Sequence, residues 1–552
     1  MARARARAAA YHRRAREAQR RAAAAVGEKL TIKTRSGWVR GRREEDVLDG
    51  VHVRSWRGIP FGADTGGDNR FRAPRPAPAW DGIRYCNKFG EVAPQPTYGW
   101  NDKVIGSEDC LSLDIVRPDT DKKLPVVVYL HGGSFIVGSS HMLMLRGLQF
   151  SATTDVVYVS VNFRLGALGY LDLRSLDGEA EANPAVLDQV LALEWVRDNI
   201  AAFGGDPENI TLMGESAGGA AVLTLMATPR AHGLFHRAIA QSSPIGMIHS
   251  RTQSRLWARE LVYRLAMPRG SSVDDLRKQR FADIVRAGQS MMWRAGELLH
   301  LNSSYGPTVD GTVIPRHPLE AFRRGEQAQV PLLIGTNSDE ASFGKYLYQR
   351  QQARARASLR LLKSFDEVNS VQVVNAYDGA LTRESFAELL ADALFWAPST
   401  RIAGYHSESM PTWMYRYDFA PQAMRWLGLG AVHSLELNNI FGDPQASRMS
   451  FLTRLGDNEQ MDSLTAAMQQ QWGHFIHQGE LDGDWPRYDT SADCPVDQQR
   501  ATKIWDVPQR IEYDPKQDKR KAWDAYRMLE WGLGRPELWK QLGMLTIAEK
   551  SE

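Results

Sequence analysis

Apolar runs of strand length, separated by stretches with helical spacing, limit the folds open to this chain. The clearest runs are rich in β-branched and aromatic residues and cover 124–130, 155–163, 209–214, 330–337 and 412–419. They are apolar throughout rather than alternating, which is typical of strands buried on both faces. The sequence therefore predicts an α/β fold: a large, mostly parallel central sheet with helices on both faces.

Helical patterns fill much of the space between and around these runs. The stretch "NPAVLDQVLALEWVRDNIAAF" (183–203) starts with an Asn-Pro helix signal and continues with apolar residues at helical spacing. Residues 250–300 and 345–400 also look helical but less tied to the sheet, so we expect cap-like insertions there. Residues 515–552 are predicted to be a helical extension, from the spacing of Trp523, Tyr526, Met528, Leu529 and Trp531.

The first 29 residues differ in composition from the rest. They are rich in alanine and arginine and hold nine basic side chains against Glu17 and Glu28, so the remainder of this +3 chain is net acidic. The segment lacks the apolar core of a secretory signal. We expect a disordered or helical solvated tail or an over-extended reading frame, with a transit-like segment or a nucleic-acid or membrane-surface patch as alternatives. One α/β domain is expected over 30–514.

The cysteines and the hydropathy bear on the compartment. Cys86, Cys110 and Cys494 form no CxxC pair, which favours neither a zinc site nor a disulfide scaffold. No apolar run reaches about 18 residues, so stable membrane insertion is not expected. A reduced, cytoplasmic protein is the simplest interpretation.

The stretch "MGESAGGA" (213–220) raises the possibility of a serine nucleophile. Gly214 and Gly218 flank Ser216 at two residues' distance, with an apolar run before and the helix-forming "AAVLTLMA" after. A sharp strand-to-helix turn needs small residues at those positions, because a Cβ would clash there. The helix N-terminus also favours developing negative charge at the hydroxyl. A plain strand-to-helix loop is the alternative, but the full context favours the nucleophile.

A serine hydroxyl needs a base, an orienting acid and donors for an oxyanion. "YLHGGSF" (129–135) could present backbone N–H groups, or could be a simple glycine turn. Asp339 and Glu340 both follow a predicted strand, where α/β sites gather, and the residues alone leave either as the acid. By themselves, His433 would be an ordinary core or surface histidine and Glu215 a surface glutamate.

Several blocks in the same order resemble the type B carboxylesterases. They cover most of residues 30–510 and include "RGIPFG" (57–62), "RFRAPRPAPAW" (70–80), "SEDCLSLDI" (107–115), "NFRLGALGYL" (162–171), "FGGDPENITLMGESAGG" (203–219), "PTVDGTVIP" (307–315), "VPLLIGTNSDEASF" (330–343) and "GAVHSLELNNIFG" (430–442). The resemblance implies an α/β-hydrolase fold and a serine ester hydrolase that works through an acyl-enzyme, with no metal or organic cofactor.

The resemblance also implies a role for each matching residue. Ser216 would be the nucleophile, Glu340 the orienting acid and His433 the general base. The oxyanion donors would be the backbone N–H groups of Gly133, Ser134 and Ala217, and Glu215 would hold polar contacts behind the nucleophile.

Two positions depart from the family pattern. Ala93 stands where many members have a cysteine, so Cys110 lacks its usual partner, with Cys86 nearby as an alternative. Ser134 stands where glycine or alanine is common, which leaves its N–H available.

Substrate and partners are harder to predict. We expect small to medium carboxylic esters, no nucleic-acid partner, and a monomer or weak homo-oligomer. A lipase, an amidase or carbamate hydrolase, and a non-catalytic binding protein on the same fold are the alternatives. An apolar pocket could draw on Trp100, Phe135, Met291, Met292, Trp293, Phe395 and Trp396, although such residues are more often core.

Overall fold

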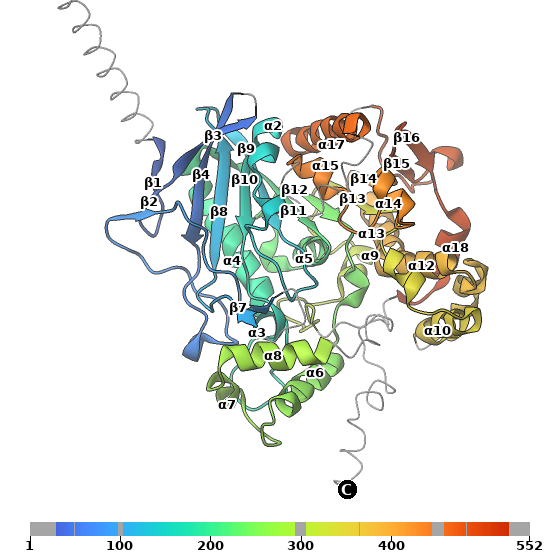
Figure 1. Cartoon of the computed structure of the whole chain (residues 1–552), viewed down its shortest axis with the longest axis horizontal. Coiled ribbons are helices and arrows are strands. Elements are labelled where there is room, and N and C mark those ends of the chain that lie inside the picture. Colours follow the sequence, from blue (N-terminus) through green and yellow to red (C-terminus); the bar gives the residue numbers. More distant parts are fainter. Residues whose placement is uncertain are drawn as a thin grey trace, which may run out of the picture.

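An eleven-stranded sheet forms the centre of the computed structural model, in the order β16-β15-β14-β13-β12-β11-β9-β10-β8-β4-β3 (Figure 1). The structure describes residues 29–48, 50–97, 103–292, 305–363, 365–443, 458–481 and 483–528. The strands from β15 to β10 in this order run parallel: β15 (Ala501–Trp505), β14 (Thr412–Tyr417), β13 (Leu332–Asn337), β12 (Arg237–Gln241), β11 (Gly205–Glu215), β9 (Leu124–Leu130) and β10 (Val157–Val161).

Antiparallel strands close both edges of this sheet. β8 (Ser112–Pro118), β4 (Val51–Pro60) and β3 (Arg42–Leu48) extend one edge, and β16 (Arg510–Tyr513) caps the other. Two small sheets stand apart, one of β1 (Thr31–Lys33), β2 (Trp38–Arg40) and β5 (Ile83–Tyr85), the other of β6 (Gln95–Pro96) and β7 (Val104–Ile105). The mostly parallel sheet predicted from the apolar runs is therefore confirmed.

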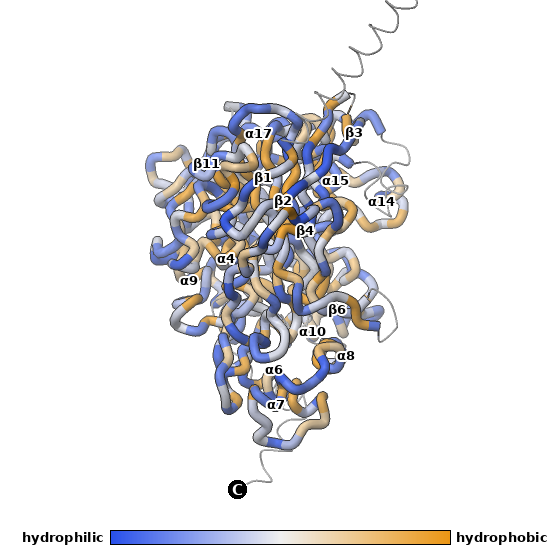
Figure 2. The backbone as a smooth tube through the Cα atoms, turned by 90° about the vertical axis from the view of Figure 1, so that its left-hand side faces the viewer, coloured by the Kyte–Doolittle hydropathy of each residue, from blue (hydrophilic) through white to orange (hydrophobic). Residues whose placement is uncertain are grey.

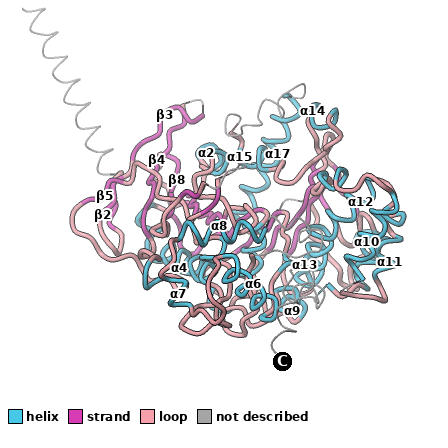
Figure 3. Tube along the Cα trace, turned by 60° about the horizontal axis from the view of Figure 1, so that its bottom comes forward, coloured by secondary structure: helices cyan, strands magenta, loops and turns pink. Residues whose placement is uncertain are grey.

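The sheet separates two hydrophobic cores, which explains why its strands are apolar on both sides. Along β9, Val126 and Val128 belong to one core, whereas Val127 and Tyr129 belong to the other. The first core is covered by α4 (Pro184–Asn199), α5 (Ala217–Met226) and α13 (Ala397–Ser407), and the second by α2 (Leu148–Thr154), α15 (Leu437–Phe441) and α17 (Asn458–Gln478). Figure 3 shows these two layers of helices on opposite sides of the strands.

Further helices pack around this three-layered body. Those within 250–300 are α6 (Arg251–Arg264), α7 (Val273–Arg277) and α8 (Phe281–Met292), and those within 345–400 include α10 (Gln351–Lys363), α11 (Ser370–Asn375) and α12 (Arg383–Ala391). The other α-helices of the described residues are α3 (Gly166–Gly169), α9 (Pro318–Arg323), α14 (Gln422–Trp426) and α18 (Gln517–Ala525). The turns around α7 and α9 are largely hydrophilic (Figure 2). The division into one domain with cap insertions stays a prediction.

Some sequence expectations concern residues outside the described ranges. These are the basic tail up to residue 28, Trp100, Trp293, Leu529 and Trp531. Within those ranges, Cys86, Cys110 and Cys494 are all unpaired thiols, so Cys110 and Cys86 form no disulfide. No helix in the described part of the chain combines the length and apolarity needed to cross a membrane.

Candidate active site

Ser216 lies on a tight turn between the end of β11 and the start of α5. Its backbone adopts φ 58° and ψ −125°, a conformation that non-glycine residues rarely adopt. A Cβ added at Gly218 would collide with the carbonyl oxygen of Leu130, and one added at Gly214 would meet the backbone of Gly218. The two glycines thus let the turn close against β9 and leave the serine hydroxyl at the carboxyl end of the sheet.

The structure brings Ser216 together with His433 and Glu340. His433 Nε2 lies 2.9 Å from Ser216 Oγ, and His433 Nδ1 lies 2.5 Å from Glu340 Oε2. The histidine comes from the loop before α15, and the glutamate from the turn that follows β13. One imidazole therefore connects a hydroxyl to a buried carboxyl group, although the three residues are far apart in the sequence.

The second oxygen of Glu340 is also held. Its Oε1 accepts the Ser242 hydroxyl at 2.6 Å and the backbone N–H of Asn337 at 2.8 Å. These two hydrogen bonds fix the orientation of the carboxylate. Ser242 follows strand β12, and Asn337 is the last residue of the neighbouring strand β13. Neither residue was predicted from the sequence.

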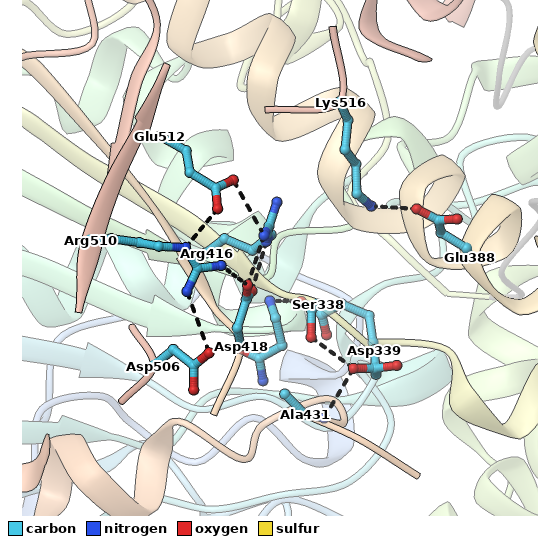
Figure 4. Close-up of polar contacts among 12 residues, drawn as sticks. Ser338, Asp339, Glu388, Arg416, Asp418, Ala431, Asp506, Arg510, Glu512 and Lys516 are labelled. Carbon is cyan, nitrogen blue, oxygen red and sulfur yellow. Dashed lines mark hydrogen bonds and ion pairs between the residues drawn. The ribbon is translucent and has the colours of Figure 1, made fainter. Parts of the chain in front are cut away.

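Asp339 contacts different groups from its neighbour Glu340. Its carboxylate accepts the Ser338 hydroxyl at 2.7 Å and the backbone N–H of Ala431 at 3.1 Å (Figure 4). Its own N–H donates to the Ala431 carbonyl at 3.1 Å. Asp339 therefore fastens the turn after β13 to the loop that carries His433, whereas Glu340 contacts the imidazole itself.

Two more carboxyl groups lie close to the imidazole. Glu215 Oε1 accepts the Ser434 hydroxyl at 2.5 Å and lies 3.3 Å from His433 Nε2. Glu436 accepts from the Asn337 amide at 2.6 Å. Burial raises the pKa of Glu215, and burial together with the nearby Glu215 and Glu340 raises the pKa of Glu436 to about 8.

The imidazole responds to these surroundings. Burial alone would lower the pKa of His433, but the carboxylates of Glu215 and Glu340 outweigh it and raise that pKa to about 9. Glu215 is 4% exposed, so it is an interior residue and not the surface glutamate that its position in the sequence alone would suggest. Glu436 was missed as a candidate, although it lies within the block that contains His433.

The loop after β9 approaches the serine turn from the other side. A Cβ added at Gly132 would lie 3.1 Å from Ser216 Cβ and 3.0 Å from Glu215 Oε2. Gly133 and Ser134 follow with φ of 116° and 54°. Ala217 is the first residue of α5, where a backbone N–H has no partner within the helix. Over the described residues, the N–H groups of Gly133, Ser134 and Ala217 donate to no backbone carbonyl.

Two of the apolar side chains expected near a pocket, Phe395 and Phe135, lie beside residues of the candidate site. Phe395 packs on the His433 ring with centroids 4.7 Å apart, and Phe135, beside Ser134, packs on Tyr170 at 4.4 Å. Met291 is fully buried, and the Trp396 ring lies near Lys516 Nζ. The side chain of Met292 is outside the described part of the structure.

Comparison with known proteins gives one consistent result. The family model described as "Carboxylesterase family" matches residues 28–523. The para-nitrobenzyl esterase of Bacillus subtilis (strain 168) is 32% identical over 501 residues, covering 89% of this chain and 97% of that protein.

The chain belongs to the carboxylesterase family.

Other carboxylesterase relatives agree in sequence and in structure. The phenmedipham hydrolase of Pseudarthrobacter oxydans is 31% identical over 466 residues, covering 81% of this chain and 91% of that protein. A solved PNB esterase superposes with a TM-score of 0.77 at 30% identity, covering 90% of this chain and all of that one. A Geobacillus stearothermophilus carboxylesterase gives 0.76 at 30% identity, with the same two coverages. The α/β-hydrolase fold is therefore confirmed, and this carboxylesterase is a serine ester hydrolase.

Proposed function

We propose that Ser216, His433 and Glu340 carry out two-step acyl transfer on small to medium carboxylic esters. The observation that carries this proposal is the continuous connection from Ser216 Oγ through the imidazole to the Glu340 carboxylate, at 2.9 and 2.5 Å. Nucleophile, base and orienting acid in this chain order are typical of α/β-hydrolases.

In the first step the ester is split and its alcohol leaves. His433 Nε2 takes the Ser216 proton while Oγ attacks the ester carbonyl carbon, and the carbonyl π electrons move to oxygen. In this proposal the N–H groups of Gly133, Ser134 and Ala217 stabilise that oxyanion, and one such donor is typically worth about 3 to 4 kcal/mol. The imidazolium then protonates the leaving alcohol as the C–O bond breaks.

In the second step water releases the acid. His433 takes a proton from water, whose oxygen attacks the acyl-enzyme carbonyl, and then returns the proton to Ser216 Oγ as the acyl–oxygen bond breaks. Throughout, the Glu340 carboxylate accepts a hydrogen bond from the Nδ1–H of His433, which fixes the tautomer and stabilises the imidazolium. Since proton transfer and hydrogen bonding by these residues account for every step, the proposal needs no metal or cofactor.

The test is hydrolysis of para-nitrophenyl esters from acetate to palmitate by the wild-type enzyme and by Ser216→Ala. We expect rates that peak at short chains and vanish in Ser216→Ala, with Ser491→Ala, an exposed serine away from the site, as the matched control. Turnover retained by pure, folded Ser216→Ala would refute the assignment of Ser216 as the nucleophile. A peak at long chains would indicate a lipase, and anilide hydrolysis an amidase.

We also propose that the enzyme acts in the cytoplasm as a monomer or weak homo-oligomer, with an ester as its small-molecule partner and no nucleic acid. The three unpaired thiols, two of them buried, support a reducing compartment. Cell fractionation and sedimentation of the purified enzyme test both points. Recovery outside the cytoplasm, or a tight oligomer at low concentration, would contradict them.

A further inference from the structure

A long helix changes its pitch in the middle, next to the catalytic histidine. α12, the π-helical turn η9 (Asp392–Trp396) and α13 follow one another without a break. Pro398 at the start of α13 has no N–H, and in a regular helix its ring would clash with the carbonyl four residues earlier. A wider π turn relieves this clash.

The π turn carries the aromatic residue that touches the imidazole. Phe395 is 9% exposed, and its ring lies 4.7 Å from that of His433, centroid to centroid, with an angle of 31° between the planes. This ring covers one side of the imidazole. A shift of the π turn would therefore move a direct neighbour of the general base.

Lys516 contacts this turn at both ends. Its Nζ lies 2.9 and 3.0 Å from the two carboxylate oxygens of Asp392 and 5.2 Å from the Trp396 ring centroid. Asp392 is 2% exposed and also accepts the Tyr377 hydroxyl at 2.7 Å. A buried carboxylate without its cation strongly destabilises the folded protein, so the ion pair constrains where the turn can lie.

The lysine is itself firmly placed. It occupies the N-cap position of α18 with φ 61° and ψ 36°, a left-handed conformation that is uncommon for a residue with a side chain. Trp523 of the same helix donates its Nε1–H to Tyr377 Oη at 2.8 Å. The element that carries Lys516 is thus connected to the Tyr377–Asp392 pair at two points.

Asp339 and Lys516 both line one cavity of about 480 Å³. Lys516, Glu388, Ser338 and Asp339 are among the residues that line it. Figure 4 shows Lys516 beside Glu388 and Ser338 beside Asp339. Asp339 holds Ala431, two residues before His433, while Lys516 holds the π turn that places Phe395. The catalytic loop is therefore held from two directions at this cavity.

We propose that Lys516 is a positioning residue: its buried pair with Asp392 holds η9 so that Phe395 keeps the His433 imidazole aligned between Ser216 and Glu340. The inference rests on the proposed function of these three residues. Lys516 touches no reacting atom and acts only through Asp392, the π turn and Phe395.

The first test compares Lys516→Met with Lys519→Met. Lys519 is a close match, because both lysines pair with Glu388 Oε1, Lys516 at 3.0 Å and Lys519 at 2.7 Å. Of the two, Lys516 is the one that is hydrogen-bonded to Asp392. For para-nitrophenyl acetate, we expect Lys516→Met to lower kcat about 10-fold or more with KM within about 2-fold, because small misplacements of catalytic groups are costly. Lys519→Met should match wild type, and Lys516→Arg should retain most of the rate.

A second set of variants covers the possibility that Lys516→Met does not fold. Asp392→Asn removes the charge of the pair with little change of shape, and Phe395→Leu removes the final contact. Each variant should lower kcat and leave KM close to its wild-type value. The double variant Lys516→Met/Phe395→Leu should lose no more than the worse single one, because both act through one contact. Wild-type kcat in Phe395→Leu, or losses that multiply, would overturn the inference.

Labelling of Ser216 by a fluorophosphonate separates this inference from the proposed function. If Ser216→Ala keeps its activity and wild type is not labelled at Ser216, the proposed function fails. If Ser216→Ala is inactive while Lys516→Met, Asp392→Asn and Phe395→Leu all turn over like wild type, only the positioning role of Lys516 fails.

Discussion

At the scale of residues, the proposed chemistry centres on one imidazole among three buried carboxyl groups. Glu215 and Glu340 both raise the pKa of His433, while burial and these two carboxylates raise the pKa of Glu436. With a pKa of about 9, the imidazole is mostly protonated at pH 7, and the base form grows as pH rises.

The pH profile of the wild-type enzyme and of Glu215→Gln tests this. The wild-type kcat/KM should fall as pH drops below about 9, because His433 must be neutral to take the serine proton. Glu215→Gln removes one of the charges that raise this pKa, so the acidic limb should move to lower pH by about 1 unit. Hydrolysis of a para-nitrophenyl ester between pH 5 and 10 gives both curves.

The control for that measurement is Glu326→Gln. Glu326 is an exposed partner of Arg316, and its replacement should leave the profile in place. A wild-type rate that does not vary between pH 5 and 8, or an unmoved limb in Glu215→Gln, would contradict this account of the histidine.

The neighbours Asp339 and Glu340 should differ sharply when each loses its charge. Glu340→Gln can no longer stabilise the imidazolium, and we expect kcat to fall about 10³-fold or more. Asp339→Asn keeps an oxygen that can accept the Ala431 N–H, so its loss should stay below about 10-fold. Steady-state kinetics of both variants decide the matter, and the opposite order would exchange their roles.

Sequence reasoning alone could not choose between these two residues. Both follow the same strand, and adjacent side chains point apart, so the pattern admits either as the acid. Ser242 and Glu436 were invisible for another reason: their bonds join segments about a hundred residues apart, Ser242 to Glu340 and Asn337 to Glu436. Only Ser216 carried a local signal, the small residues that its turn requires.

At the scale of elements, the turn between β11 and α5 should be intolerant of a single methyl group. A Cβ at Gly218 would collide with the backbone of Leu130, which the sheet holds in place. We expect Gly218→Ala to abolish turnover and lower the free energy of unfolding by about 1 to 3 kcal/mol, the usual cost of overpacking. Thermal unfolding and ester hydrolysis measure the two effects.

Gly483→Ala is the matched change, since a Cβ there meets nothing within 4 Å. It should leave both quantities at their wild-type values. A Gly218→Ala enzyme with full activity would mean that the turn can move away from β9.

The strands were predictable to the extent that their residues are apolar on both sides. The run 124–130 coincides with β9, whereas the run 155–163 shortens to Val157–Val161. β12, with only five residues and arginine and glutamine at its ends, has no strand-like run, and neither does the edge strand β16 (Arg510–Tyr513), which is partly exposed. Short strands and edge strands owe their conformation to their neighbours in the sheet rather than to their own composition.

At the scale of the whole molecule, the proposed site depends on loops that lie at the carboxyl ends of the parallel strands. Ser216 follows β11 and Glu340 follows β13, in agreement with the general place of ligand sites in α/β sheets. The loop after β10 is fastened to α4 by a buried ion pair: Arg164 Nε lies 2.8 Å and Nη2 2.6 Å from the two Asp188 oxygens. Arg164 also donates to the carbonyl of Arg72, so one guanidinium joins three distant segments.

Loss of this guanidinium should therefore weaken the fold as a whole. The two side chains are 2% and 0% exposed, so Arg164→Met leaves an unpaired buried carboxylate, and we expect the free energy of unfolding to fall by about 3 to 5 kcal/mol. Arg316→Met breaks an exposed pair and should cost at most about 1 kcal/mol. Thermal unfolding of both variants gives the comparison. Because the cost arises from the uncompensated charge, Arg164→Met/Asp188→Leu should unfold at a higher temperature than Arg164→Met alone; an equal or lower midpoint would mean that the bond to Arg72, rather than the ion pair, holds the segments together.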